Sequence, residues 1–121
     1  MMNELLTRHL LQRFPKMFEL EDGPKVWGFE CGDGWFDLIY RLCKDLEKLD
    51  PNIQLTQVKE KFGGLRAYLS CIPNARILAR ICQAEEESMV TCEECGKPGR
   101  RGNIKESSWI ITRCPEHGVP A

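Results

Sequence analysis

Two short pairs of metal-ligand residues near the C-terminus constrain this chain more than any other feature. Cys92 and Cys95 are separated by two residues, with Gly96 directly after them, and Cys114 and His117 have the same spacing. This pattern is typical of a zinc ribbon or a treble-clef-like fragment. Three thiolates and one imidazole would fill a tetrahedral shell, which predicts a structural rather than a catalytic Zn²⁺. The alternative is a redox pair of Cys92 and Cys95, with the other two residues unconnected to it.

The remaining cysteines have no such spacing. The chain holds seven cysteines in 121 residues, and their distribution favours a metal site and buried thiols over disulfides. Cys31, Cys43, Cys71 and Cys82 lie in apolar surroundings and are expected to be small buried residues. Cys31, next to Gly32, is the one of these four to test for reactivity.

Hydrophobic periodicity predicts three helices and a hairpin. Helical spacing covers residues 3–14, 33–49 and 73–88, and Asp33 is the expected N-cap of the second helix. From residue 53 the pattern alternates, and two glycines supply a turn, which predicts a β-hairpin over residues 53–69. We therefore expect an α+β fold, with three helices around a small antiparallel sheet in residues 1–90 and a zinc-ribbon-like module in residues 91–121 packed on that core.

The same patterns predict which side chains point inward. In the third helix we expect Leu78 and Cys82 to be buried beside Ile77 and Ile81. In the first strand of the hairpin, Leu55 and Gln57 are expected on the face opposite Val58, residues 21–24 read as a turn, and residues 109–112 read as a strand.

The charge balance excludes a general attraction to polyanions. The formal net charge is −1, so any electrostatic partner would meet a local patch. No apolar run approaches the roughly 20 residues of a membrane span. Arg8 and Arg13 interrupt the N-terminal leucines, which is unlike a signal peptide. The expected location is the cytoplasm.

The predicted hairpin carries a candidate ligand site. Lys59, Lys61 and Arg66 flank the adjacent Gly63 and Gly64. Three cations near exposed backbone N–H groups suit phosphate or another anion. The alternative is a solvated hairpin tip in which the glycines serve only the turn.

Aromatic residues strengthen the ligand hypothesis. Phe62 and Tyr68 belong to the hairpin, while Trp27, Phe29 and Trp35 lie in a glycine-rich loop. Aromatic rings and cations together suit a nucleobase and its phosphates, so Trp35 and Tyr68 are the expected stacking residues. The alternative is that these rings belong to the core.

A second basic group lies in the predicted zinc module. Its members are Lys97, Arg100, Arg101, Lys105 and Arg113. Arg100 and Arg101 could contact nucleic-acid phosphates, although the interval between the ligand pairs lacks the helix of a sequence-reading finger. The group could instead balance the acidic end of the third helix.

The order of these motifs resembles a family of small uncharacterised proteins from phages, prophages and bacteria. The likeness rests on the Gly-Asp-Gly-Trp segment (residues 32–35), the Val-Lys-Glu-Lys-Phe-Gly-Gly-Leu-Arg segment (residues 58–66) and the two ligand pairs. The resemblance implies a phage setting, with host takeover, regulation or counter-defence as general roles and the host cytoplasm as location. Sequestration of a nucleotide immune signal is one such role, linked to this chain by analogy.

No catalytic constellation is recognisable in the sequence. The histidines are His9 and His117, and neither a phosphate-binding lysine loop nor a dinucleotide fingerprint occurs. We therefore expect a non-enzymatic protein that binds a phosphorylated small molecule, and a homo-oligomer is one form that the binding protein could take. The alternatives are a nucleic-acid-binding regulator and a protein-binding adaptor.

Overall fold

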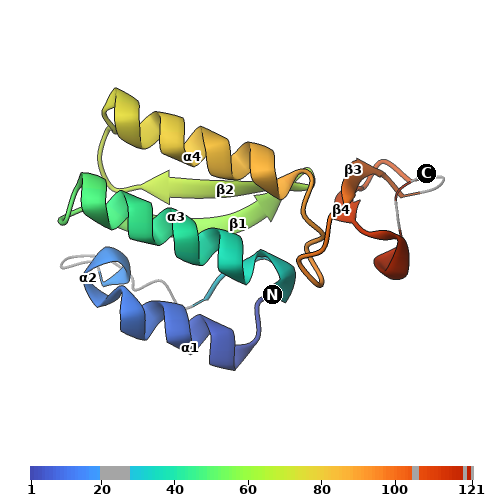
Figure 1. The fold of residues 1–121 in the computed structure, drawn as a ribbon, viewed down its shortest axis with the longest axis horizontal. Coiled ribbons are helices and arrows are strands. Elements are labelled where there is room, and N and C mark those ends of the chain that lie inside the picture. The colour runs from blue at the N-terminus through green and yellow to red at the C-terminus, as the bar shows by residue number, and fades with distance from the viewer. Residues whose placement is uncertain (20–27, 105–106, 119, 121) are drawn as a thin grey trace.

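The computed structural model describes residues 1–19, 28–104, 107–118 and 120 and confirms the α+β fold class. Four α-helices and two separate two-stranded antiparallel sheets lie in these residues (Figure 1). The helices are α1 (Glu4–Arg13), α2 (Pro15–Phe18), α3 (Phe36–Leu49) and α4 (Ala75–Ser88). The strands are β1 (Leu55–Lys61), β2 (Gly64–Leu69), β3 (Arg100–Asn103) and β4 (Ile110–Arg113), and the 3₁₀ turns are η1 (Asp33–Trp35) and η2 (Pro115–His117). The predicted turn at residues 21–24 and Trp27 lie outside the described residues.

The helix boundaries follow from local capping. The Asn3 side chain accepts a hydrogen bond from Leu6 N at 2.9 Å, and Asn74 accepts one from Ile77 N at 2.9 Å, so each caps the helix that it precedes. Pro15 ends α1 and occupies the first turn of α2, where its missing N–H costs nothing. This short α2 is the helix that the three-helix prediction lacked.

Asp33 does not cap the second helix as predicted. Its carboxylate accepts from Asn3 N at 2.7 Å and from Asn3 Nδ2 at 2.9 Å, and α3 begins with no side-chain cap. The Asp33 carboxylate therefore binds Asn3, before the start of α1, instead of capping the second helix. These two hydrogen bonds join α1 to the segment that leads into α3.

The helices cover one face of the β1–β2 hairpin. Figure 1 shows α3 and α4 side by side in front of the two strands, and α3 contacts α4 while α4 contacts β2. The largest fully buried side chains form one core between these layers, namely Trp35, Phe14, Phe29, Leu10, Ile39, Leu42, Leu46, Leu55 and Leu65. The second sheet, β3–β4, lies beyond the turn of the hairpin.

The hairpin is confirmed, but its turn and its phase differ from the prediction. Phe62 (φ 52°) and Gly63 (φ 77°) are the turn residues, while Gly64 already pairs with Lys61. The register shifts between Leu55 and Gln57. This irregularity buries Leu55 and Val58 on the same side, whereas strict alternation would separate them.

The buried face of α4 is rotated relative to the predicted one. Ile77, Ile81, Ala84 and Ser88 are buried, at the spacing of one helical stripe. Leu78, predicted to be inward, is 51% exposed. Cys82 is exposed as well, because both residues lie one position beyond the stripe that meets β2 and α3.

Candidate metal centre and ligand groove

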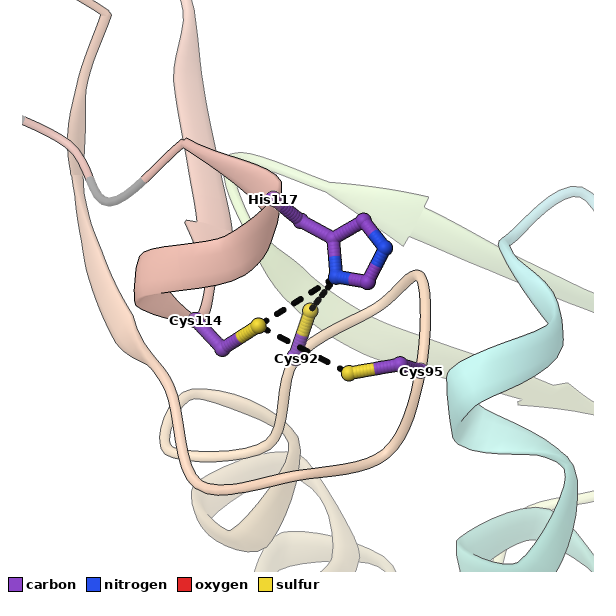
Figure 2. A group of neighbouring side chains, drawn as sticks. All are labelled: Cys92, Cys95, Cys114 and His117. Carbon is purple, nitrogen blue, oxygen red and sulfur yellow. Dashed lines mark hydrogen bonds between the residues drawn. The ribbon is translucent and has the colours of Figure 1, made fainter.

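The four predicted metal ligands converge on one point (Figure 2). Their ligand atoms all lie within 4.8 Å of one another. Cys114 Sγ lies 3.2 Å from His117 Nδ1, Cys92 Sγ lies 3.8 Å from the same nitrogen, and Cys95 Sγ lies 3.6 Å from Cys114 Sγ. The cluster is therefore close enough to bind a metal ion, with Nδ1 as the nearest imidazole donor.

These separations fit a tetrahedral shell better than a disulfide. Bond lengths of about 2.3 Å to sulfur and about 2.0 Å to nitrogen place neighbouring donors about 3.5–3.8 Å apart. A disulfide would need sulfurs about 2.05 Å apart, and all seven cysteines are free. The geometry favours metal binding over the redox-pair alternative.

Local turns present the ligands. Gly96 adopts φ 81° and its N–H donates to Cys92 O at 2.9 Å, while Cys92 N donates to Lys97 O at 2.8 Å. We call residues 92–96 the knuckle. The second pair sits on η2, where His117 N donates to Cys114 O at 3.0 Å. The β3–β4 sheet lies between the two pairs along the chain, as in a zinc ribbon.

The Cys114 thiol is prepared for metal binding. Its removal from water raises the pKa, but hydrogen bonds with His117, Cys95 and Cys92 outweigh this and lower the pKa of Cys114 to about 6. The thiolate, which is the ligand form, is therefore favoured near neutral pH.

The knuckle docks on residues 32–35, which we call the docking segment. Gly34 N donates to Glu93 O at 2.7 Å, and Gly32 N donates to the Glu93 carboxylate at 2.7 Å. The Trp35 indole N–H donates to Thr91 O at 2.9 Å. Burial raises the pKa of Glu93, and the bond from Gly32 offsets part of this effect. The glycines permit this close approach of backbone to backbone.

The prediction that Trp35 stacks on a ligand is wrong, and the docking explains why. Its side chain is fully buried and its N–H is taken by Thr91. The core alternative is therefore correct for Trp35 and for the fully buried Phe29.

The hairpin tip is the second contact with the C-terminal segment. The Thr112 hydroxyl donates to Gly63 O at 2.6 Å, and Arg101 Nε donates to Phe62 O at 2.7 Å. Gly63 N donates to the Glu60 carboxylate at 2.7 Å. The predicted anion cradle of free glycine amides is thus wrong for Gly63, whose N–H is already bound, and Gly64 is part of the buried ladder.

The predicted cations do gather on one face of the hairpin. Lys59 lies directly opposite Arg66, and Lys61 and Tyr68 follow two positions along their strands on the same side. Arg66 lies 3.6 Å from the Glu85 carboxylate and donates to Leu65 O. Among the described residues, no hydrogen bond or ion pair engages the ammonium group of Lys59 or Lys61.

A groove opens beside these lysines, between the hairpin tip and the start of β4. Its volume is about 300 Å³. The residues that line it are Lys59, Glu60, Lys61, Phe62, Ser108, Trp109 and Ile110. Trp109 was missed as a site residue, because in the sequence it reads only as the first residue of an apolar strand. No local signal distinguishes it.

The second basic group is mostly engaged. Arg101 bonds Phe62 O and Arg100 bonds Pro120 O, while Lys97 pairs with Glu116 at 3.1 Å. Arg113 pairs with Glu94 at 3.2 Å. Lys105 lies outside the described residues. These arginines and lysines therefore act largely within the C-terminal segment itself.

The predictions for the other cysteines are partly wrong. Cys31 is buried, and burial raises the pKa of its thiol to about 12, so it is not the reactive cysteine. Burial likewise raises the pKa of Cys43 to about 12. Cys71 and Cys82 are exposed rather than buried.

Comparison of the chain with family models, curated proteins and solved structures finds no match. The resemblance to a phage and bacterial family therefore stays a prediction. The function has to be inferred from the residues of the site. Among the helices of the described residues, none combines the length and apolar composition that a bilayer span requires.

Replacing Gly34 with alanine should loosen the docked knuckle. The new Cβ would lie 2.2 Å from Cys92 O and 2.6 Å from Cys95 N, both backbone atoms. We expect the free energy of unfolding to fall by about 1–3 kcal/mol, as for overpacking, in a denaturant titration. Gly28→Ala is the matched control, because its Cβ meets only the end of the Met1 side chain at 2.8 Å. Equal losses in both variants would contradict the docking.

Thiol alkylation should report the metal centre. In metal-loaded protein the exposed Cys71 and Cys82 should react first with iodoacetamide, and a chelator should then release the three cysteines of the cluster. Cys31 and Cys43, with a pKa of about 12, should react only after unfolding. Peptide mapping by mass spectrometry gives the order. Labelling of Cys95 as fast as Cys71 before chelation would contradict a ligand role.

Proposed function

We propose that this protein is a zinc-stabilised, non-catalytic binding protein for a phosphorylated nucleotide. Zinc is the preferred ion for three thiolates and one imidazole in tetrahedral arrangement. The four ligands leave no position for water or substrate, so the ion would act by joining the two ligand pairs. Its binding free energy would add to folding of the C-terminal segment.

The ammonium groups of Lys59 and Lys61, which no hydrogen bond or ion pair engages within the described part of the chain, carry the binding part of the proposal. Both lysines line the groove, and Lys59 lies directly opposite Arg66. Like charges in a directly opposed pair repel each other, and the Glu85 carboxylate, 3.6 Å from Arg66, meets only the arginine of this pair. A phosphate offers the charge and the acceptor oxygens that such a cluster lacks.

The positions of the two histidines support ligand binding rather than catalysis. His117 belongs to the metal cluster, and the His9 ring packs against Phe36 at 5.6 Å between centroids. Neither is therefore placed beside the lysines as a proton-transfer group. A protein that binds a nucleotide without changing it can act by sequestering it. If the protein belongs to the phage family that its motifs resemble, the sequestered ligand would be a nucleotide signal.

The nucleic-acid alternative centred on Arg100 and Arg101 has less support. Both guanidinium groups already donate to backbone oxygens, Arg100 to Pro120 O and Arg101 to Phe62 O. Binding of phosphates there would compete with these bonds.

Native mass spectrometry should find one zinc ion per chain. Cys95→Ser should lose the ion, because one of four ligands is weakened, and amide exchange should then rise in residues 91–118 while α3 and α4 stay protected. Ser70→Ala, a hydroxyl change outside the cluster, is the control. A fully protected C-terminal segment in metal-free protein would contradict a structural ion.

The double variant Lys59→Ala/Lys61→Ala should bind ATP and inorganic tripolyphosphate at least about tenfold more weakly, because charge-assisted bonds to phosphate are lost. Isothermal titration calorimetry measures both ligands. The control is Lys44→Ala/Lys48→Ala, which removes the same charge from the exposed side of α3. Equal affinities for wild type and the groove variant would refute the proposed site, and conversion of ATP would refute the absence of catalysis.

A further inference from the structure

Phe62 occupies a backbone conformation that its side chain does not favour. Its φ of 52° lies in the left-handed region, which bulky residues adopt only at a cost and which glycine or asparagine normally occupies in such turns. The ring is 58% exposed, so burial does not offset the cost. An exposed aromatic ring retained on strained backbone points to a role for the ring itself.

Trp109 presents a second exposed ring to the same groove. Its side chain is 66% exposed, yet its backbone is held on both sides. Trp109 N donates a hydrogen bond to Ser107 Oγ at 3.0 Å, and Trp109 O accepts one from Ile104 N at 2.9 Å. The backbone that carries the indole is thus held in place, and the indole is open to solvent.

The charges of the groove complement a phosphate backbone. Among the residues that line the groove, Lys59 and Lys61 are positive and Glu60 alone is negative. The Glu60 carboxylate is bound to Gly63 N at 2.7 Å within the turn. The Lys61 ammonium lies 5.7 Å from the centroid of the Phe62 ring, which places a cation next to a stacking surface.

The shape of the groove distinguishes between two sources of a base joined to a phosphate. Pockets for free small molecules bury most of the ligand, whereas here both rings are more than half exposed. Single strands bind differently, through successive bases on open aromatic surfaces beside cations. A duplex cannot use such rings, because its bases are already paired and stacked.

We infer that the groove binds unpaired nucleotides of a single-stranded nucleic acid, with Phe62 and Trp109 stacking on bases and Lys59 and Lys61 contacting the adjoining phosphates. This inference rests on the proposed function and narrows its ligand class from a phosphorylated nucleotide to a strand. It also replaces the predicted stacking residue Trp35 with Trp109.

The test uses the full-length, zinc-loaded protein and a labelled oligothymidylate of about 10 nucleotides at low salt, read by fluorescence anisotropy. Trp109→Leu and Phe62→Leu should each weaken binding about tenfold, the usual effect of losing one base–aromatic stack. Trp109→Phe keeps a ring and should bind within a few-fold of wild type. Leu78→Ala, which removes an exposed apolar side chain from α4, is the control and should have no effect.

Three further ligands distinguish this inference from the proposed function. Tripolyphosphate has no base, so its binding should fall in the lysine variant and stay unchanged in both ring variants. Thymidine monophosphate and a duplex of the same length should bind far more weakly than the single strand. Equal wild-type affinity for the monophosphate and the strand would overturn the inference while leaving the proposed function intact. Unchanged binding of the strand in both leucine variants would overturn the inference as well. Unchanged binding of tripolyphosphate in the lysine variant would refute the proposed function.

Discussion

The hydrogen bonds that Glu93 makes with the docking segment organise the rest of this structure. Its backbone oxygen and its side chain both accept from glycine amides, those of Gly34 and Gly32. Its own N–H donates to Thr112 O at 3.1 Å, so one residue ties together the core, the knuckle and β4. Any side chain at Gly32 or Gly34 would collide with knuckle backbone. The approach is therefore available only to glycine at these two positions.

Metal centre and groove are linked by this arrangement. The candidate metal ligands Cys92 and Cys95 flank Glu93 and Glu94, and β4 leads directly to Cys114. β4 also supplies Thr112, whose hydroxyl bonds Gly63 at the hairpin tip. One wall of the groove comes from β1 and the hairpin turn, and the other comes from residues 108–110 at the start of β4. An ion that holds the two ligand pairs together would thus also hold the two walls at a fixed separation.

Sequence reasoning succeeded where neighbours along the chain decide the outcome and failed where distant partners compete. The ligand pairs, the hairpin and the helices at α1 and α4 depend on residues a few positions apart, and all of them are present. Asp33 has the right chemistry for a local cap, but Asn3 offers it two donors. On α4 the apolar residues span a broad stripe. Packing against β2 and α3 selected Ala84 and Ser88 in place of Leu78 and Cys82.

By itself, the sequence determined the α+β class, the helical and strand periods and the four residues that lie close enough to bind a metal, because each depends on spacing within a few residues. Only the tertiary structure decided what the aromatic rings and glycines do. Trp35 became core because Thr91 captures its indole N–H, and Trp109 became the exposed ring beside the lysines. The glycines of the docking segment and of the hairpin turn make hydrogen bonds with segments about 50–60 positions away along the chain. The physical reason is that a hydrogen-bonding group takes whichever partner the fold brings near, and no local pattern encodes a partner so distant along the chain.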